Sequence, residues 1–132
     1  MKKFHQAVIS VGANIDPHHN IERAKNILGS QLLDCSPLLI TTPEGYTEQP
    51  DFINCAFLIQ TTLTADALKQ QLLSIESQLG RVRTANKNGP RTIDLDITVF
   101  DGEIVDDDFY KYNFVKKSIL HLLPELNYKE EK

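Results

Sequence analysis

The 132-residue sequence contains few of the residues that mark metal-binding, disulfide-rich or low-complexity proteins. Its two cysteines, Cys35 and Cys55, lie in separate expected elements, without another Cys or a His nearby at metal-ligand spacing. We therefore expect neither a zinc site nor a disulfide scaffold, and we interpret both thiols as small buried side chains in a reducing cytoplasm. Six glycines and six prolines are too few for a collagen-like or disordered chain.

Long apolar runs and an excess of positive charge are also absent. The apolar run near the N-terminus, residues 7–11, is interrupted by Ser10 and is too short for the core of a signal peptide. No run approaches the length of a membrane-spanning helix. Lys and Arg number 14 against 18 Asp and Glu, a net charge of -4, which argues against nucleic acid or an anionic membrane as a partner. We expect a cytoplasmic monomer.

The residues that are present are typical of one globular domain, which we assign to residues 1–132. Hydrophobic residues make up 41% and charged residues 24%, and no internal repeat or linker divides the chain. Periodicity and turn residues predict strands at 4–11, 38–42, 52–62 and 91–100, helices at 17–29 and 65–80, and a short strand after Asp101-Gly102. The order β-α-β-β-α-β is that of a ferredoxin-like α+β sandwich, whose two helices cover one sheet face and leave the other free for a ligand.

The spacing within these elements separates core from surface. Alternation in strand 52–62 puts Phe52 and Asn54 on one face, opposite Ile53 and Cys55. Helix 65–80 has a core stripe flanked by Glu76, and the stripe consists of Leu68, Leu72, Ile75 and Leu79. Strand 91–100 alternates between an apolar face with Ile93, Leu95, Ile97 and Val99 and a polar face with Thr92, Asp94, Asp96 and Thr98. The expected helix caps are Asp16 and Thr64.

Two carboxylates on the polar face of strand 91–100 predict a magnesium site. Asp94 and Asp96 are separated by a rise of roughly 6 to 7 Å, which leaning side chains can close. Adjacent like charges are unfavourable on a sheet unless a cation lies over them, and Mg²⁺ prefers hard oxygen ligands. The alternative is an ordinary solvated strand face.

The segment before that strand is the one basic region of an acidic chain. Arg81, Arg83, Lys87 and Arg91 follow one another without an intervening acid. Planar guanidinium groups beside a metal-binding carboxylate pair suit the transfer of a polyphosphate group. The alternative is a solvated loop that pairs with the acidic stretch 101–108.

The Phe52 and Asn54 side chains suit a flat heterocycle. An aromatic ring can stack on such a ligand, while an amide can both donate to and accept from its edge. By itself, a Phe and an Asn two residues apart on a strand are as easily explained by packing and a surface amide.

Taken together, these residues resemble the 6-hydroxymethyl-7,8-dihydropterin pyrophosphokinase family over roughly residues 5–105. The resemblance rests on motifs in the family's order and spacing. They are Gly12-Ala13-Asn14, Thr41-Thr42-Pro43-Glu44-Gly45, Gln49-Pro50-Asp51-Phe52-Ile53-Asn54, Ile75-Glu76 through Leu79-Gly80-Arg81-Val82-Arg83, and Gly89-Pro90-Arg91-Thr92-Ile93-Asp94-Leu95-Asp96. The last motif is highly specific and the third nearly so, whereas the first two alone are weak.

The resemblance implies the ferredoxin-like fold and an ATP-dependent transfer of pyrophosphate to a reduced pterin, with release of AMP, in folate biosynthesis. It implies that Asp94 and Asp96 hold two Mg²⁺ ions. It also implies that Arg81, Arg83 and Arg91 grip phosphates in catalysis, with loop 81–89 mobile in the free protein and closed over the substrates. The implied nucleotide-binding residues are Glu76, Arg91 and Lys116, and the implied pterin-binding residues are Thr41, Thr42, Pro43, Glu44, Phe52 and Asn54.

The chain departs from the family's pattern in the mobile loop and in its C-terminal part. Asn88 replaces a loop aromatic, and the segment from Tyr110 onward is rewritten. Lys116 keeps a positive charge without a bidentate fork, and Ser118 stands where a second pterin-stacking ring is expected. Either the Ser118→Phe substitution restores that ring and tightens binding, or a ring from Tyr110, Tyr112 or Phe114 already fills the gap. His121 is expected to begin a final Leu-rich helix.

Two other functions remain alternatives to the enzyme. A non-catalytic module could keep the fold and bind a pterin or a nucleotide without turnover. Such a module has little reason to keep two carboxylates suited to metal ions, Asp94 and Asp96, together with three arginines suited to phosphates. A nucleic-acid-binding ferredoxin-like domain is disfavoured by the net charge and by the lack of a basic, aromatic sheet face.

Overall fold

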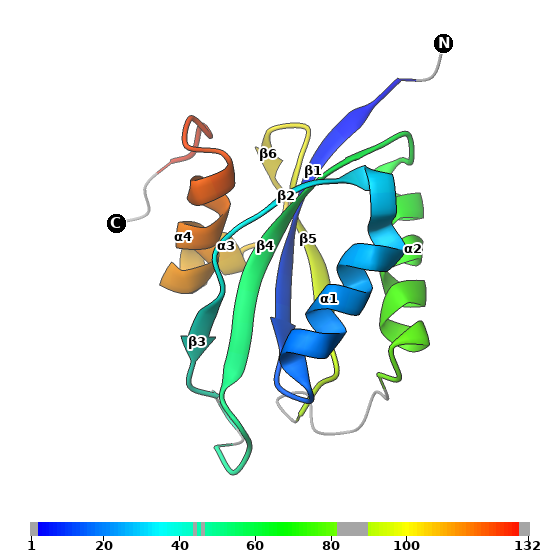
Figure 1. Cartoon of the computed structure of the whole chain (residues 1–132). Coiled ribbons are helices and arrows are strands. Elements are labelled where there is room, and N and C mark those ends of the chain that lie inside the picture. The colour runs from blue at the N-terminus through cyan, green and yellow to red at the C-terminus, as the bar shows by residue number, and fades with distance from the viewer. Residues whose placement is uncertain (1–2, 44, 46, 82–89, 130–132) are drawn as a thin grey trace.

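One antiparallel sheet organises the chain, and the computed structural model describes residues 3–43, 45, 47–81 and 90–129 (Figure 1). The elements are β1 (His5–Ala13), α1 (Pro17–Leu28), the 3-10 helix η1 (Gly29–Gln31), β2 (Leu32–Cys35), β3 (Leu39–Thr41), β4 (Phe52–Thr61), α2 (Ala65–Gln78), β5 (Asp94–Phe100), β6 (Glu103–Ile104), α3 (Asp108–Lys111) and α4 (Asn113–Leu122). The described part holds no helix long and apolar enough to cross a membrane.

The strand order is β2-β4-β1-β5-β6, with β3 also paired to β4, and every pairing is antiparallel. This order and these directions confirm the expected ferredoxin-like α+β fold. The central strand β1 joins segments that are distant in sequence, because Gly12 lies opposite both Asn54 on β4 and Asp94 on β5. Ser10, two residues earlier, lies opposite Asp96. The register of β1 therefore gathers the candidate polar residues on one sheet face.

Helices α1 and α2 cover the opposite face, as Figure 1 shows. The predicted stripe of α2 is buried there with Ile53, Phe57 and other strand residues. Thr64 caps α2 by accepting from the backbone N–H of Ala67, as expected. The cap predicted for α1 is wrong in one respect: Asp16 precedes the helix with a left-handed backbone (φ 43°), and its side chain makes no capping hydrogen bond.

The other sheet face is only partly free, which corrects the sequence-based expectation. Helices α3 and α4 cover part of it (Figure 1), and their Phe109, Val115 and Ile119 pack on residues of β1, β4 and β5. The final helix begins at Asn113, and the expectation that His121 begins it is wrong, because His121 is its penultimate residue. Apolar side chains recur at helical spacing from residue 115 onward, and Pro124 soon prevents continuation.

Four further details differ from the sequence-based expectations. The edge strand β2 was not expected, and β5 starts at Asp94 rather than at Arg91. A bulge adds Thr98 as an extra residue opposite β1. Val99 therefore lies not on the face covered by α1 and α2, as expected, but on the face covered by α3 and α4. Cys35 is only half-buried, and a hydrogen bond from the thiol of Cys55 lowers its pKa.

Candidate active site

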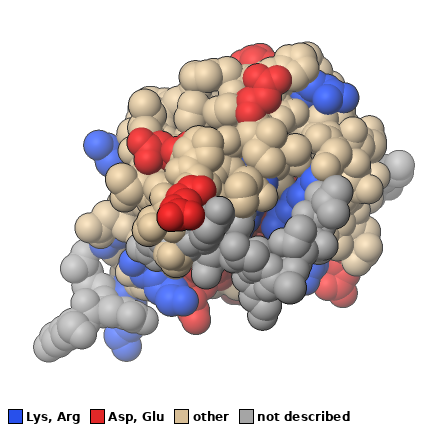
Figure 2. Space-filling model, turned by 90° about the horizontal axis from the view of Figure 1, so that it is seen from below, with Lys and Arg blue, Asp and Glu red and all other residues tan. Residues whose placement is uncertain are grey.

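A cavity of about 210 Å³ lies on the sheet face that α3 and α4 leave open. Its floor comes from β1, β4 and β5, its rim from the end of β3, and its roof from the α3–α4 region. Seven predicted site residues line it: Thr41, Thr42, Phe52, Asn54, Arg91, Asp94 and Asp96. Figure 2 views the end of the molecule where β1 ends and β5 begins, and it shows basic side chains in a hollow with acidic side chains nearby.

The other predicted residues are placed differently. Pro43, Glu76, Arg81 and Lys116 do not line the cavity. Glu44 and Arg83 lie outside the described residues, as do Asn88 and all of the loop 81–89 that was expected to be mobile except Arg81. The ammonium group of Lys116 lies over the ring of Tyr128, 4.6 Å from its centroid.

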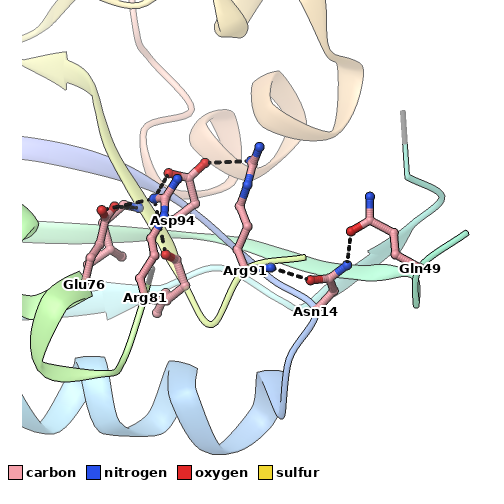
Figure 3. A network of polar contacts seen from close by, with 8 residues as sticks. Asn14, Gln49, Glu76, Arg81, Arg91 and Asp94 are labelled. Carbon is pink, nitrogen blue, oxygen red and sulfur yellow. Dashed lines mark hydrogen bonds and ion pairs between the residues drawn. The ribbon is translucent and has the colours of Figure 1, made fainter. Parts of the chain in front are cut away.

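Asp94 is held between two arginines (Figure 3). Nη1 of Arg81 donates to Oδ1 of Asp94 at 2.8 Å, and Nη1 of Arg91 donates to Oδ2 at 3.1 Å. Among the described residues no arginine is paired with Asp96 in this way, and more than a third of the surface of Asp96 is exposed. Partial desolvation in the concave site, followed by the negative charges of Asp94 and other carboxylates, raises the pKa of Asp96 to about 7.

Glu76 fixes the position of Arg81 from behind the cavity. Its carboxylate is buried, accepts from the Leu95 N–H at 2.8 Å and pairs with Nη1 of Arg81 at 3.0 Å. The chain can turn back this sharply because Gly80 takes the left-handed conformation (φ 88°) after α2, and the Arg81 N–H then bonds to the Glu76 carbonyl. Glu76 thus links the helix to the first residues of β5 and to the cation on Asp94.

Asn14 is a site residue for which the sequence analysis gave a motif but no role. Its side chain is buried, its Oδ1 accepts from the Arg91 N–H at 2.8 Å, and its Nδ2 donates to Gln49 Oε1 at 2.7 Å and to the Pro50 carbonyl at 3.0 Å. Backbone N–H groups of Asn14 and Ile15 also bond to the Arg91 carbonyl. Figure 3 shows Asn14 joining Arg91 to Gln49. Asn14 therefore holds Arg91 close to the residues that immediately precede Phe52 and β4.

Phe52 and Asn54, the residues predicted to bind a flat heterocycle, line the same cavity as Arg91 and Asp94. The guanidinium carbon of Arg91 lies 5.8 Å from the centroid of the Phe52 ring. Nδ2 of Asn54 donates to Thr41 Oγ1 at 2.6 Å. A Cβ atom at Gly12 would lie 3.0 Å from Oδ1 of Asn54, so the glycine is what lets the amide approach β1 this closely.

The roof of the cavity comes from the rewritten C-terminal segment. Tyr112, Phe114 and Ser118 line it, whereas Tyr110 packs edge to face on Phe109 with ring centroids 5.0 Å apart. Rings from this segment thus reach the cavity, as the second alternative of the sequence analysis requires. Ser118 itself is buried.

The described residues contain no group of three or more His, Cys, Asp and Glu side chains arranged to hold a metal ion. Asp94 and Asp96 together offer carboxylate oxygens from one cavity floor, which is a donor set of the kind that Mg²⁺ shares with phosphates and waters. The predicted residues therefore fit a site that a phosphate-bearing ligand completes.

Comparisons with known proteins support one family. The model for 7,8-dihydro-6-hydroxymethylpterin-pyrophosphokinase (HPPK) matches residues 8–124. The folic acid synthesis protein fol1 of Schizosaccharomyces pombe is 35% identical over 133 residues, which cover 91% of this chain but 18% of that protein. The 2-amino-4-hydroxy-6-hydroxymethyldihydropteridine pyrophosphokinase of Campylobacter jejuni is 35% identical, covering 89% of this chain and 79% of its own length. The protein of that name from Methylorubrum extorquens is 41% identical, covering 64% and 54% respectively. Motifs, fold and family match agree, and this chain belongs to the 7,8-dihydro-6-hydroxymethylpterin-pyrophosphokinase family.

Proposed function

We propose that this chain transfers the pyrophosphoryl group of ATP to 6-hydroxymethyl-7,8-dihydropterin and releases AMP, as the names of its relatives suggest. The observation that carries the proposal is that one cavity is lined both by Phe52 and Asn54, which suit a flat heterocycle, and by charged residues that suit phosphates and their metal ions. These charged residues are Arg91, Asp94 and Asp96. In this reaction the hydroxymethyl oxygen attacks the β-phosphorus, the bond from that phosphorus to the α,β-bridging oxygen breaks, and the hydroxyl proton is released.

The pterin would lie against the sheet floor. Phe52 offers a flat apolar surface, and Asn54 can donate to and accept from the edge of the ring system. Thr41 fixes the Asn54 amide by accepting its N–H, so the amide oxygen is oriented before the ligand arrives. Thr42 lines the cavity beside them, and we propose that backbone groups of Pro43 and Glu44 complete this side.

The arginines would bind the polyphosphate of ATP. In the described state Arg81 and Arg91 both pair with Asp94. A triphosphate carries more negative charge than one carboxylate and offers bidentate acceptors, so we propose that the arginines turn to it and leave Asp94 free. Arg83 is proposed to act with them, and Glu76 would contribute by holding Arg81 rather than by touching the nucleotide. A nucleotide contact of Lys116 stays a prediction.

Asp94 and Asp96 would hold Mg²⁺, for which we propose two ions. When bound there, the ions would neutralise charge on the transferred phosphates. The role of the protein would be to place two carboxylates two residues apart on β5, beside the central strand β1. In the free protein Arg81 and Arg91 occupy Asp94 and so compete with a metal ion for its carboxylate. Because ATP would draw the arginines away from Asp94, we expect the metal and ATP each to bind more tightly when the other is present.

A turnover assay tests this function. The protein is incubated with ATP and Mg²⁺, with and without 6-hydroxymethyl-7,8-dihydropterin, and AMP is measured by chromatography. We expect AMP only when the pterin is present, with a loss of at least about 100-fold in Arg91→Ala and Asp96→Asn. The surface variant Glu22→Gln, which removes the charge of an exposed side chain paired with Lys25, serves as the control. Tight binding of both ligands without AMP would instead support the non-catalytic alternative.

A further inference from the structure

The cavity roof contains a buried hydroxyl group that has no hydrogen-bond partner among the described residues. Ser118 is 3% exposed and lines the cavity, and its Oγ makes no hydrogen bond within the described part of the chain. Its helix α4 presents the same face at Phe114, four residues earlier, and at Val115. These neighbouring side chains are apolar and offer no acceptor, so the remaining partners for this hydroxyl are the Phe114 carbonyl and a polar group within the cavity.

An unpaired hydroxyl at this position is costly and avoidable. Buried polar side chains are almost always hydrogen-bonded, and a helical serine can bond to the carbonyl four residues earlier. Ser118 does not use the Phe114 carbonyl in this way. An alanine would fit the same space and favour the helix more. A serine that weakens the free protein in this way is expected where the bound state uses its hydroxyl.

The position of Ser118 defines what it could contact. Asn54 and Thr41 supply polar groups from the sheet side of the cavity, whereas Ser118 supplies one from the helix side. Tyr112 and Phe114 line the same roof, with ring centroids 5.4 Å apart. A flat heterocycle between floor and roof would thus meet the Asn54 amide from one side and the Ser118 hydroxyl from the other.

We infer that Ser118 is a ligand-binding and specificity-determining residue, whose hydroxyl bonds to a polar atom of the bound bicyclic heterocycle that Asn54 does not reach. The inference rests on the proposed function for the identity of that heterocycle. It also assigns a use to Phe114, which lies one helical turn before Ser118, lines the same cavity and would help to exclude water from the bound heterocycle. In this arrangement Ser118 is not a vacancy left by a lost aromatic ring, and the Ser118→Phe substitution overfills the roof and weakens binding.

Two measurements on each variant test this inference. The affinity for 6-hydroxymethyl-7,8-dihydropterin is measured by fluorescence titration with a non-hydrolysable ATP analogue present, and the thermal midpoint Tm of the free protein is measured in parallel. Ser118→Ala should bind the pterin about five- to tenfold more weakly, because the bound ligand loses a hydrogen bond. Its Tm should nevertheless rise, because an unpaired hydroxyl is removed. The control Ser77→Ala, at an exposed position of α2, reports the gain in helix propensity alone and should leave affinity unchanged.

A second pair of variants keeps the test valid if alanine disturbs the roof. Ser118→Thr and Ser118→Val have the same shape and differ in the hydroxyl, so we expect the threonine variant to bind the pterin more tightly than the valine variant. Equal affinities within this pair, or an unchanged affinity in Ser118→Ala while the wild type binds, would overturn the inference and leave the proposed function intact. Failure of the wild type to bind the pterin would refute the proposed function, and the inference with it.

Discussion

Replacing Asn14 by alanine should lower both the stability of the folded protein and its affinity for ATP. The substitution leaves the backbone N–H of Arg91, which is part-buried, without its acceptor at 2.8 Å. An orphaned buried donor costs about 1–3 kcal/mol. The Gln49 side chain and the exposed Pro50 carbonyl lose a donor as well, but water can replace it there. We therefore expect the free energy of unfolding to fall by about 2–3 kcal/mol, which corresponds to a fall of about 8 °C in Tm.

Asn20→Ala is the matched control for this prediction. Asn20 is also a buried asparagine, and its side chain donates to the Ile15 carbonyl at 2.7 Å; neither residue lines the cavity. Both variants should lose stability in thermal denaturation. At a temperature where both are folded, only Asn14→Ala should raise the KM for ATP several-fold, because Arg91 is no longer held. A loss below about 0.5 kcal/mol in Asn14→Ala, or equal KM values in the two variants, would refute the reasoning.

Three further predictions concern other contacts of the site. Glu76→Gln removes the charge from a buried ion pair and should cost about 2–4 kcal/mol in denaturant unfolding, whereas the exposed control Glu22→Gln should cost less than about 0.5 kcal/mol. Gly12→Ala brings a methyl group to 3.0 Å from Asn54 Oδ1, so pterin affinity measured by titration should fall several-fold with little change in Tm. The pKa of Asp96 rises from 3.8 to about 7 on folding, so the folded state holds the proton more tightly and stability falls as pH rises through that interval. Without Mg²⁺, Asp96→Asn should accordingly unfold like the wild type near pH 4 but be more stable by about 1–2 kcal/mol at pH 8, a value discounted for the exposure of the carboxylate; equal stabilities at pH 8 would contradict the shift.

Local signals in the sequence were sufficient for most of the fold. Thr64 and Gly80 bracket α2 because a capping hydroxyl and a left-handed residue act within a few positions of the helix ends. The hairpin before β6 follows from Asp101-Gly102, both of which take positive φ values. Strand β2 could not be predicted, because its four residues continue the preceding helical pattern and become a strand only by pairing with β4.

The site divides in the same way. Asp94, Asp96, Phe52 and Asn54 were predictable as cavity residues, because strand alternation decides which face they share. The role of Asn14 depends on a contact across 77 residues, which no local pattern encodes. The sequence pointed to Ser118 and the rings at 110, 112 and 114 through the family resemblance, but the coverage of this sheet face by α4 could not be predicted for a related reason. Its apolar spacing indicates a helix, but only the packing of that helix on β4 and β1 shows that it closes over the ligand face.

The central claim is that one cavity carries a pyrophosphoryl transfer between ATP and a pterin, and the fate of each phosphorus atom tests it most directly. The wild-type protein is incubated with Mg²⁺, 6-hydroxymethyl-7,8-dihydropterin and ATP labelled separately at the α-, β- or γ-phosphorus, and the products are separated and counted. The proposed function predicts that the β and γ labels both appear in the pterin product, that the α label appears in AMP, and that the two products form in equal amounts. Release of ADP, or AMP formed at the same rate without the pterin, would contradict it.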